Sequence, residues 1–324
     1  MNRHLPTAAS APNVTATGLL QEPTVLLLIT GTLIGLNFPL GKIAGEAGVS
    51  PMTWALLISL GAALFLLPLL MATRKLVLPS KRVLRYTVIS ALVSFITPNL
   101  LLFTVIPRVG AGYTGLMFAL SPVFTLLLAF VFRMKTPGRL GRIGIATGLL
   151  GAAIVSLTRG ASPAGPGVGW LLAALAIPAA LAAGNVYRTL DWPEGASPNV
   201  LAFWGHAFSS GVFFWLLLLT RGTLPLNELA PVAGVALAQL LVAGMTFPAF
   251  FLLQQKGGPV LLSQIGYVAA AVGLATATVF LGERYSLMTW LGASVIAVGI
   301  VITMVAQKIG DPMEVSNEPE NATQ

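Results

Sequence analysis

The chain has 324 residues, of which 56% are hydrophobic and only 9% are charged, whereas a typical soluble domain carries roughly 25% charged residues. The absence of cysteine excludes disulfides and thiolate metal sites, and His4 and His206 are too few for a histidine metal cluster, so we expect no metal and no cofactor. The net charge of +8 does not indicate a nucleic-acid surface, because the basic residues lie in short segments between apolar stretches.

Ten apolar stretches follow one another along the chain, each close to the 20 or so residues that cross a hydrocarbon core about 30 Å thick. A polar segment, residues 1–23, precedes them and does not resemble a signal peptide. The predicted spans are Thr24–Ala44, Pro51–Thr73, Tyr86–Ile106, Ala111–Phe132, Gly141–Leu157, Gly167–Tyr187, Asn199–Leu219, Val232–Leu253, Val260–Phe280 and Thr289–Val305. The acidic tail, residues 307–324, is expected to be disordered. The pattern predicts an all-α membrane protein with ten transmembrane helices.

The basic residues predict how these spans are oriented. With both termini in the cytoplasm, 13 of the 18 basic residues fall on the cytoplasmic side, as the positive-inside rule requires. Those 13 include Arg188 and Lys256, which this count treats as loop residues. We therefore expect a multi-pass protein of the bacterial inner membrane.

The second half of the chain repeats the first at an offset of 148 residues. The offset pairs Asn37 with Asn185 and Gly110 with Gly258, and it places each of the first five spans on one of the last five. Because five is odd, the two halves enter the membrane in opposite senses, which is an inverted repeat. We predict a first five-helix repeat at 24–158 and an inverted second repeat at 159–306, which can expose one site to either side by alternating access.

Short motifs recur at fixed places along the spans. They are Gly35-Leu36-Asn37-Phe38 with Lys42, Ala119-Leu120-Ser121-Pro122, Gly184-Asn185-Val186-Tyr187-Arg188, and Leu281-Gly282-Glu283-Arg284 followed by Trp290, Gly292 and Gly299. Together they resemble the ten-helix EamA branch of the drug/metabolite transporter superfamily over almost the whole chain. The resemblance implies efflux or exchange of amino acids and related metabolites. The basic residue frequent in the second helix of that family is missing here.

Polar side chains at bilayer depth are costly unless they are paired, so they mark candidate substrate contacts. Asn37 and Asn185 are equivalent in the two halves and would face each other across the pseudo-twofold axis, either as an interhelical hydrogen bond or as substrate ligands. His206 lies within the seventh span, where a substrate or proton role competes with that of a neutral, hydrogen-bonded histidine. Gln264 and Tyr267 share one helical face.

Proline positions add further candidates. Pro98, Pro122 and Pro248 free backbone carbonyls that can contact a solute where the helix lines a cavity, although helix bending alone is the alternative. The predicted substrate-binding residues are Asn37, Asn99, Tyr113, Phe118, Ser121, Asn185, His206, Gln264 and Tyr267.

Two further patterns favour structural roles. Gly141, Gly144, Gly148 and Gly151 form a stripe of small residues that predicts close helix packing, within the bundle or between protomers. Lys42 lies four residues before Glu46, so we expect an intrahelical ion pair, and a contact to a substrate carboxylate is the alternative.

The predicted cavity is apolar and aromatic with a few amides, which suits a neutral or zwitterionic solute better than a phosphate. We therefore predict an exporter or exchanger of small metabolites, with amino acids favoured, that is surrounded by membrane lipids and is a monomer or a homodimer. No carboxylate is expected in the hydrocarbon core, so facilitated diffusion or exchange is the simpler mechanism. The alternatives are efflux of amphiphilic drug-like compounds and a non-transporting scaffold or sensor. A serine hydrolase would need His206 with Ser209 or Ser210 and lacks a nucleophile-elbow sequence.

Overall fold

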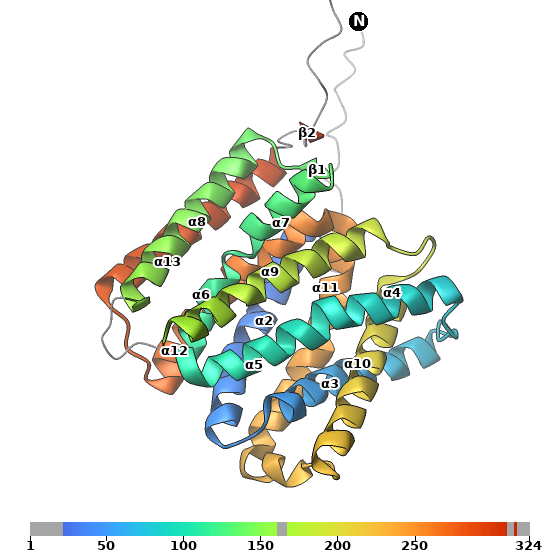
Figure 1. Cartoon of the computed structure of the whole chain (residues 1–324). Helices are drawn as coiled ribbons and strands as arrows, with labels where there is room; N and C mark the ends of the chain where they lie inside the picture. Colours follow the sequence, from blue (N-terminus) through green and yellow to red (C-terminus); the bar gives the residue numbers. More distant parts are fainter. Residues whose placement is uncertain (1–21, 161–166, 310–313, 316–324) are drawn as a thin grey trace, which may run out of the picture.

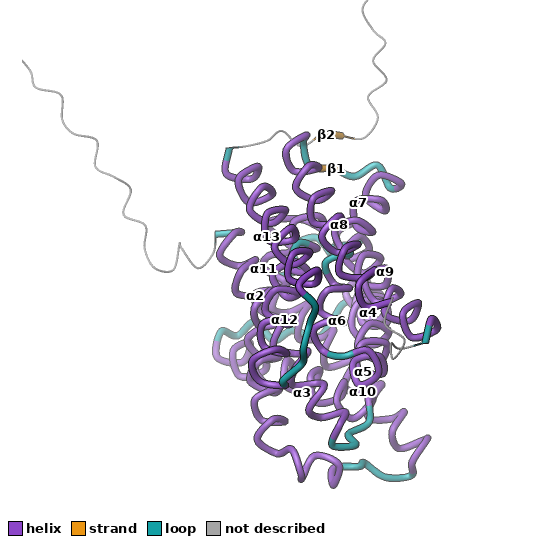
Figure 2. Tube along the Cα trace, turned by 90° about the vertical axis from the view of Figure 1, so that its left-hand side faces the viewer, coloured by secondary structure: helices purple, strands orange, loops and turns teal. Residues whose placement is uncertain are grey.

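The computed structural model of the chain describes residues 22–160, 167–309 and 314–315. The predicted polar tail before residue 22 and most of the predicted disordered tail after residue 309 lie outside the described residues. The described part is a helical bundle with one short antiparallel contact between two strands of two residues each (Figures 1 and 2). The all-helical prediction is therefore confirmed.

The elements follow the predicted order, with a few helices divided. The first half contains α2 (Pro23–Glu46), α3 (Pro51–Ala72), α4 (Lys81–Ala91), the π-helix η1 (Leu92–Ile96), α5 (Thr97–Val109), α6 (Ala111–Phe118), α7 (Ser121–Val131), β1 (Lys135–Thr136) and α8 (Arg139–Gly160). The second half contains α9 (Val168–Leu190), α10 (Pro198–Arg221), the 3-10 helix η2 (Leu226–Val232), α11 (Ala233–Ser263), α12 (Ile265–Leu281), α13 (Leu287–Lys308) and β2 (Glu314–Val315).

Seven helical stretches of the described chain are long and apolar enough to cross a membrane. They comprise α2, α3, α9, α10 and three composite stretches, Lys81–Val109, Ala111–Val131 and Leu226–Ser263. Two shorter apolar helices, Ile265–Leu281 and Leu287–Thr303, accompany them. The chain is thus a multi-pass membrane protein, as its composition indicates.

The helices are interrupted where proline or glycine changes the backbone. Pro98 has no N–H with which to close an ordinary helical turn, and the chain forms the π-helix η1 directly before it, with Thr97 N–H bonding to the Leu92 carbonyl. Gly110 and Gly258 have φ of +95° and +68°, which side chains on L residues rarely allow. These two glycines end α5 and bend α11, at equivalent places in the two halves.

Two helices pack directly against the helix that stands 148 residues later in the chain. α8 lies along α13 and α3 crosses α10 (Figure 1). In addition, α6 contacts α12, which is not its counterpart at this offset. Between these pairs, α2 packs against both α11 and α12, so helices of the two halves interleave through the core. The core is therefore shared between the halves.

Glycines determine the contact between α8 and α13. A Cβ atom on Gly151 would lie 2.6 Å from the Gly292 carbonyl oxygen and 2.7 Å from the Ile296 nitrogen, both backbone atoms of α13. A Cβ atom on Gly299 would lie equally close to the backbone of Gly148 and Gly144. Later residues of α8 thus contact earlier residues of α13, so the two helices are antiparallel. The predicted small-residue stripe is confirmed as a packing surface within the bundle.

We expect Gly151→Ala to lower the free energy of unfolding by about 1–3 kcal/mol, because neither helix backbone can move aside cheaply. Thermal unfolding of the purified protein in detergent measures the loss. Gly211→Ala is the matched control, since nothing lies within 4 Å of its added methyl group on α10 and alanine favours helix. Equal melting temperatures for the two variants would contradict the packing role.

Candidate substrate site and its two ends

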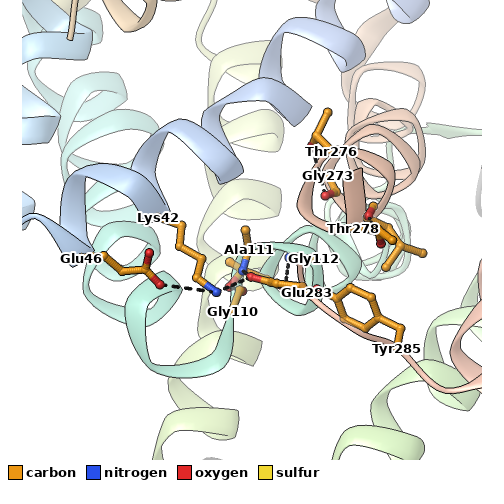
Figure 3. A network of polar contacts seen from close by, with 12 residues as sticks. Lys42, Glu46, Gly110, Ala111, Gly112, Gly273, Thr276, Thr278, Glu283 and Tyr285 are labelled. Atoms are coloured by element: carbon orange, nitrogen blue, oxygen red, sulfur yellow. Dashed lines mark hydrogen bonds and ion pairs between the residues drawn. The ribbon is translucent and has the colours of Figure 1, made fainter. Parts of the chain in front are cut away.

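One end of the bundle is closed around the carboxylate of Glu283, in the connection between α12 and α13 (Figure 3). Glu283 Oε1 lies 2.5 Å from Lys42 Nζ and accepts the Ala111 N–H at 3.0 Å. Oε2 accepts the Gly112 N–H at 3.4 Å and the hydroxyl of Tyr285. The carboxylate therefore ties α2 to the N-terminus of α6, where the helix dipole favours negative charge.

Burial would raise the pKa of the Glu283 carboxyl group, but Lys42, the Tyr285 hydroxyl and the Ala111 N–H together lower it below its ordinary value. The predicted Lys42–Glu46 pair is present at 3.6 Å, yet the contact to Glu283 is shorter and the Glu283 side chain is only 10% exposed. The interhelical partner, which local spacing could not indicate, is therefore the principal one.

A second carboxylate, Glu228 on η2, closes the same end. It accepts the Ser50 N–H and the Thr53 hydroxyl, both at 2.9 Å, and it pairs with Arg221. Glu228 thus joins the α2–α3 turn to the α10–α11 connection. We call the end of the bundle held by Glu283 and Glu228 the closed end.

The opposite end contains a cavity of about 500 Å³. Its lining comes from the end of α9, the α9–α10 connection and the bend in α11, namely Thr189, Trp192, Gly195, Ala196, Ser197, Pro198, Gln254, Gln255 and Gly258. Beside it, Asp191 pairs with Arg85 at 2.7 Å and accepts the Tyr187 hydroxyl at 2.7 Å. We call this the cavity end, and its volume is within the range of small-molecule sites.

A buried arginine lies behind the cavity wall. Arg188 on α9 is 1% exposed, and its Nη2 donates to Asn185 Oδ1 at 2.7 Å and to Gln254 Oε1 at 3.1 Å. The guanidinium also lies 4.9 Å from the ring centre of Phe250 and 5.8 Å from that of Phe95. Counting Arg188 as a loop residue was therefore wrong, because its side chain turns into the bundle.

His206 lies beside this arginine in an aromatic environment. Its ring is 4.3 Å from Phe95 and 3.7 Å from Phe247 between centroids, and neither ring nitrogen has a hydrogen-bond partner in the described part of the chain. Ser209 and Ser210 donate to backbone carbonyls of α10 and not to the imidazole. The serine–histidine pairing that a hydrolase needs is thus not formed.

The two equivalent asparagines do not meet. Asn37 Oδ1 accepts from Gln239 at 2.7 Å, whereas the Asn185 carbonyl oxygen accepts from Gln254 at 3.2 Å. Since Gln239 and Gln254 both lie on α11, about 22 Å apart at 1.5 Å per residue, the asparagines belong to different regions of the bundle. The expectation that they face each other is wrong. Asn37 instead bonds a glutamine of the other half of the chain, and Asn185 bonds a glutamine of its own half.

The remaining predicted site residues are distributed along the core. Tyr113 and Phe118 are buried on α6, and Phe118 contacts Phe38 edge-on at 5.0 Å between ring centroids. Ser121 begins α7, Asn99 is half-buried on α5, and Gln264 is buried at the junction of α11 and α12. Tyr267 donates to the Ile145 carbonyl at 3.3 Å and thereby contacts α8.

None of the nine predicted residues lines this cavity, but the Asn185 carbonyl oxygen accepts hydrogen bonds from two residues that do, Gln254 and Thr189. The sequence interpretation missed Thr189, Arg188 and Gln254. Gln254 carried a usable signal, because it is an amide directly after an apolar run. The predicted span Val232–Leu253 ends one residue before it.

The fold and the two ends define a class: a multi-pass helical membrane protein with a solute-sized cavity at one end and a polar closure at the other. The EamA-like transporter family model matches residues 23–157. This match agrees with the predicted resemblance over the first half of the chain.

Known proteins resemble the chain over most of its length. The "Uncharacterized inner membrane transporter YedA" of Escherichia coli strain K12 is 24% identical over 87% of this chain and 92% of its own, as are the proteins of that name in strains O6:H1 and O157:H7. A solved crystal structure, described only as that of a protein, matches with a TM-score of 0.65 at 17% identity, covering 87% of this chain and 97% of its own. These similarities agree with a multi-pass protein of the inner membrane.

We expect Glu283→Gln to lower the free energy of unfolding by about 3 kcal/mol, because it leaves Lys42 without its buried counter-ion. The matched control is Glu46→Gln, which removes the longer contact of the same lysine at a side chain that is 59% exposed and should cost at most about 1 kcal/mol. Thermal unfolding in detergent compares them. A larger loss for Glu46→Gln would contradict the assignment.

The contribution of Glu283 should depend on pH. Because its pKa is lowered in the folded protein, its stabilising effect is complete above its ordinary pKa and is lost as the pH falls through the lowered value. The difference in melting temperature between wild type and Glu283→Gln should therefore be constant near neutral pH and shrink below about pH 4. A difference that widens in acid would have the wrong sign.

Proposed function

We propose that the protein carries small neutral or zwitterionic metabolites, amino acids foremost, across the bacterial inner membrane by alternating access. In this proposal ten helices form two inverted five-helix repeats, 24–158 and 159–306, and both termini lie in the cytoplasm. The carrier works as an exporter or exchanger surrounded by membrane lipids, as a monomer or a homodimer.

The positions of the helices support the repeat. α8 and α13 begin and end 148 residues apart, at 139 and 287 and at 160 and 308. Gly110 and Gly258 share both this offset and a positive φ. Contacts between equivalent helices, such as α8 with α13 and α3 with α10, are expected when a twofold axis relates the halves.

The observation that carries the proposal is the difference between the two ends. The carboxylates of Glu283 and Glu228 hold the closed end together through their hydrogen bonds and ion pairs. The other end instead contains a cavity of about 500 Å³. The Lys42–Glu283 pair has no repeat-related copy, because the residues at the equivalent positions are Leu190 and Lys135. A carrier that alternates would break the Glu283 contacts to open the closed end, and its cavity end would then close.

Radiolabelled counterflow in proteoliposomes tests the transport proposal. Vesicles loaded with unlabelled L-leucine or L-phenylalanine should accumulate the labelled amino acid transiently, and protein-free vesicles should not. Flux of amphiphilic amines without amino-acid flux would instead favour drug efflux. The absence of any flux would favour a scaffold or sensor.

Cysteine labelling tests the alternation, because the natural chain contains no cysteine that would have to be removed. Ala196→Cys, in the cavity lining, should react with a membrane-impermeant maleimide from the cytoplasmic side. Val109→Cys, fully buried beside Gly110, should react slowly, and adding Glu283→Gln should speed its labelling several-fold from the opposite side. Unchanged labelling at residue 109 would contradict the role of Glu283 in closure.

A further inference from the structure

We propose that Arg188 is the binding site for a single carboxylate group of the transported solute, and that the Gln254 side chain occupies this site while it is empty. This inference deepens the proposed function and rests on it, because it names the chemical group by which the carrier would recognise an amino acid. It also adds a positive charge to a cavity that the sequence predicts to be apolar and aromatic with a few amides.

The charge of Arg188 is the first reason. An isolated buried cation costs several kcal/mol unless a counter-ion compensates it, and within the described residues Arg188 pairs with no carboxylate. The nearby carboxylate of Asp191 is already engaged by Arg85 and the Tyr187 hydroxyl. The aromatic rings around the guanidinium ease its burial but do not neutralise it.

The unused donors are the second reason. A guanidinium presents its N–H groups in a planar fork that matches the two oxygens of a carboxylate. Among the described residues, hydrogen bonds are formed by Nη2 only, and the buried Nε has no partner. An arginine kept only to join α9 to α11 would not need to bury an unsatisfied donor, which costs about 1–3 kcal/mol.

Gln254 shows how a ligand would reach the arginine. Its Oε1 accepts from Arg188, its Nε2 donates to Thr189 Oγ1 at 2.5 Å, and both Gln254 and Thr189 line the cavity. The amide group thus lies between the cavity and the guanidinium, and it has nearly the shape of a carboxylate without the charge. A rotation of this side chain would admit a carboxylate that makes the same contact and adds the missing negative charge.

The surroundings determine the class of ligand. One guanidinium balances one negative charge, so a phosphate dianion would be left with excess charge in a low-dielectric site. Phe95, Phe250 and Phe251 pack around Arg188, and Trp192 lines the cavity, which provides apolar surface for the rest of the solute. An amino acid with an apolar side chain, or an apolar monocarboxylate, satisfies both conditions.

Equilibrium binding to the purified full-length protein tests the inference without relying on flux. The probes are two matched sets: L-leucine, 4-methylpentanoate and 3-methylbutylamine, and L-phenylalanine, 3-phenylpropanoate and phenethylamine. In each set the last compound lacks the carboxylate and the middle one lacks the amine. Wild type should bind the two carboxylates of at least one set about tenfold more tightly than the amine. Inorganic phosphate at equal concentration should not compete.

The variants separate recognition from folding. Arg188→Gln should abolish the preference for carboxylates and leave amine binding unchanged. The matched control is Arg108→Gln, which removes an exposed arginine elsewhere in the chain and should preserve the preference. If Arg188→Gln does not fold by size-exclusion chromatography, Arg188→Lys takes its place and should reduce the preference, because lysine lacks the planar fork. Gln254→Ala should retain or strengthen carboxylate binding, since it empties the site.

Several results would overturn the inference. These are equal binding of acid and amine by wild type, no binding of either acid set, competition by phosphate, and a preference that survives removal of the guanidinium. Failure of the transport proposal is distinguishable, because a protein that binds carboxylates through Arg188 but shows no counterflow would keep the site and lose the carrier role. A protein that shows counterflow but no carboxylate preference would keep the carrier role and lose the proposed site at Arg188.

Discussion

Hydrocarbon offers no hydrogen-bond partner, so a polar group inside the bundle is costly unless it finds one within the protein. This constraint explains where the chain places its few polar side chains. At one end, Glu283 binds the N-terminus of α6 and a lysine of α2. At the other end, Arg188 donates hydrogen bonds to two side-chain amides. The apolar and glycine contacts between them are common to any tight helix pair, whereas these two groups distinguish one end of the molecule from the other.

The two charged groups differ in how completely they are satisfied. Glu283 has a counter-ion, two backbone N–H groups and a hydroxyl, so its site is full. Arg188 has two neutral amide oxygens and aromatic faces, so its site lacks charge. In an alternating carrier this asymmetry has a use, because the full site stabilises the closed end and the incomplete site is stabilised further only when a solute supplies the anion.

Much of the fold could be predicted because it depends on local properties. The lengths of the apolar stretches predict the spans, and the offset of 148 residues pairs Gly110 with Gly258, which both have a positive φ. The position of Arg188 could not be predicted by counting charges, since a count places a residue near a helix end but does not say which face of the helix it occupies. The offset likewise indicates that Asn37 and Asn185 occupy equivalent positions in the two halves, but it does not indicate how far each residue lies from the pseudo-twofold axis.

The π-helix η1 connects these local rules to the site. Pro98 prevents ordinary helical bonding one turn earlier, and the wider turn that results carries Phe95, which contacts His206, Phe247 and Arg188. Gly184 lets α9 approach this turn so closely that a Cβ there would lie 2.4 Å from Ser94 Oγ. A proline and a glycine far apart in the sequence thereby bring the arginine and its aromatic neighbours together, and the chemistry of the cavity end follows from two backbone requirements.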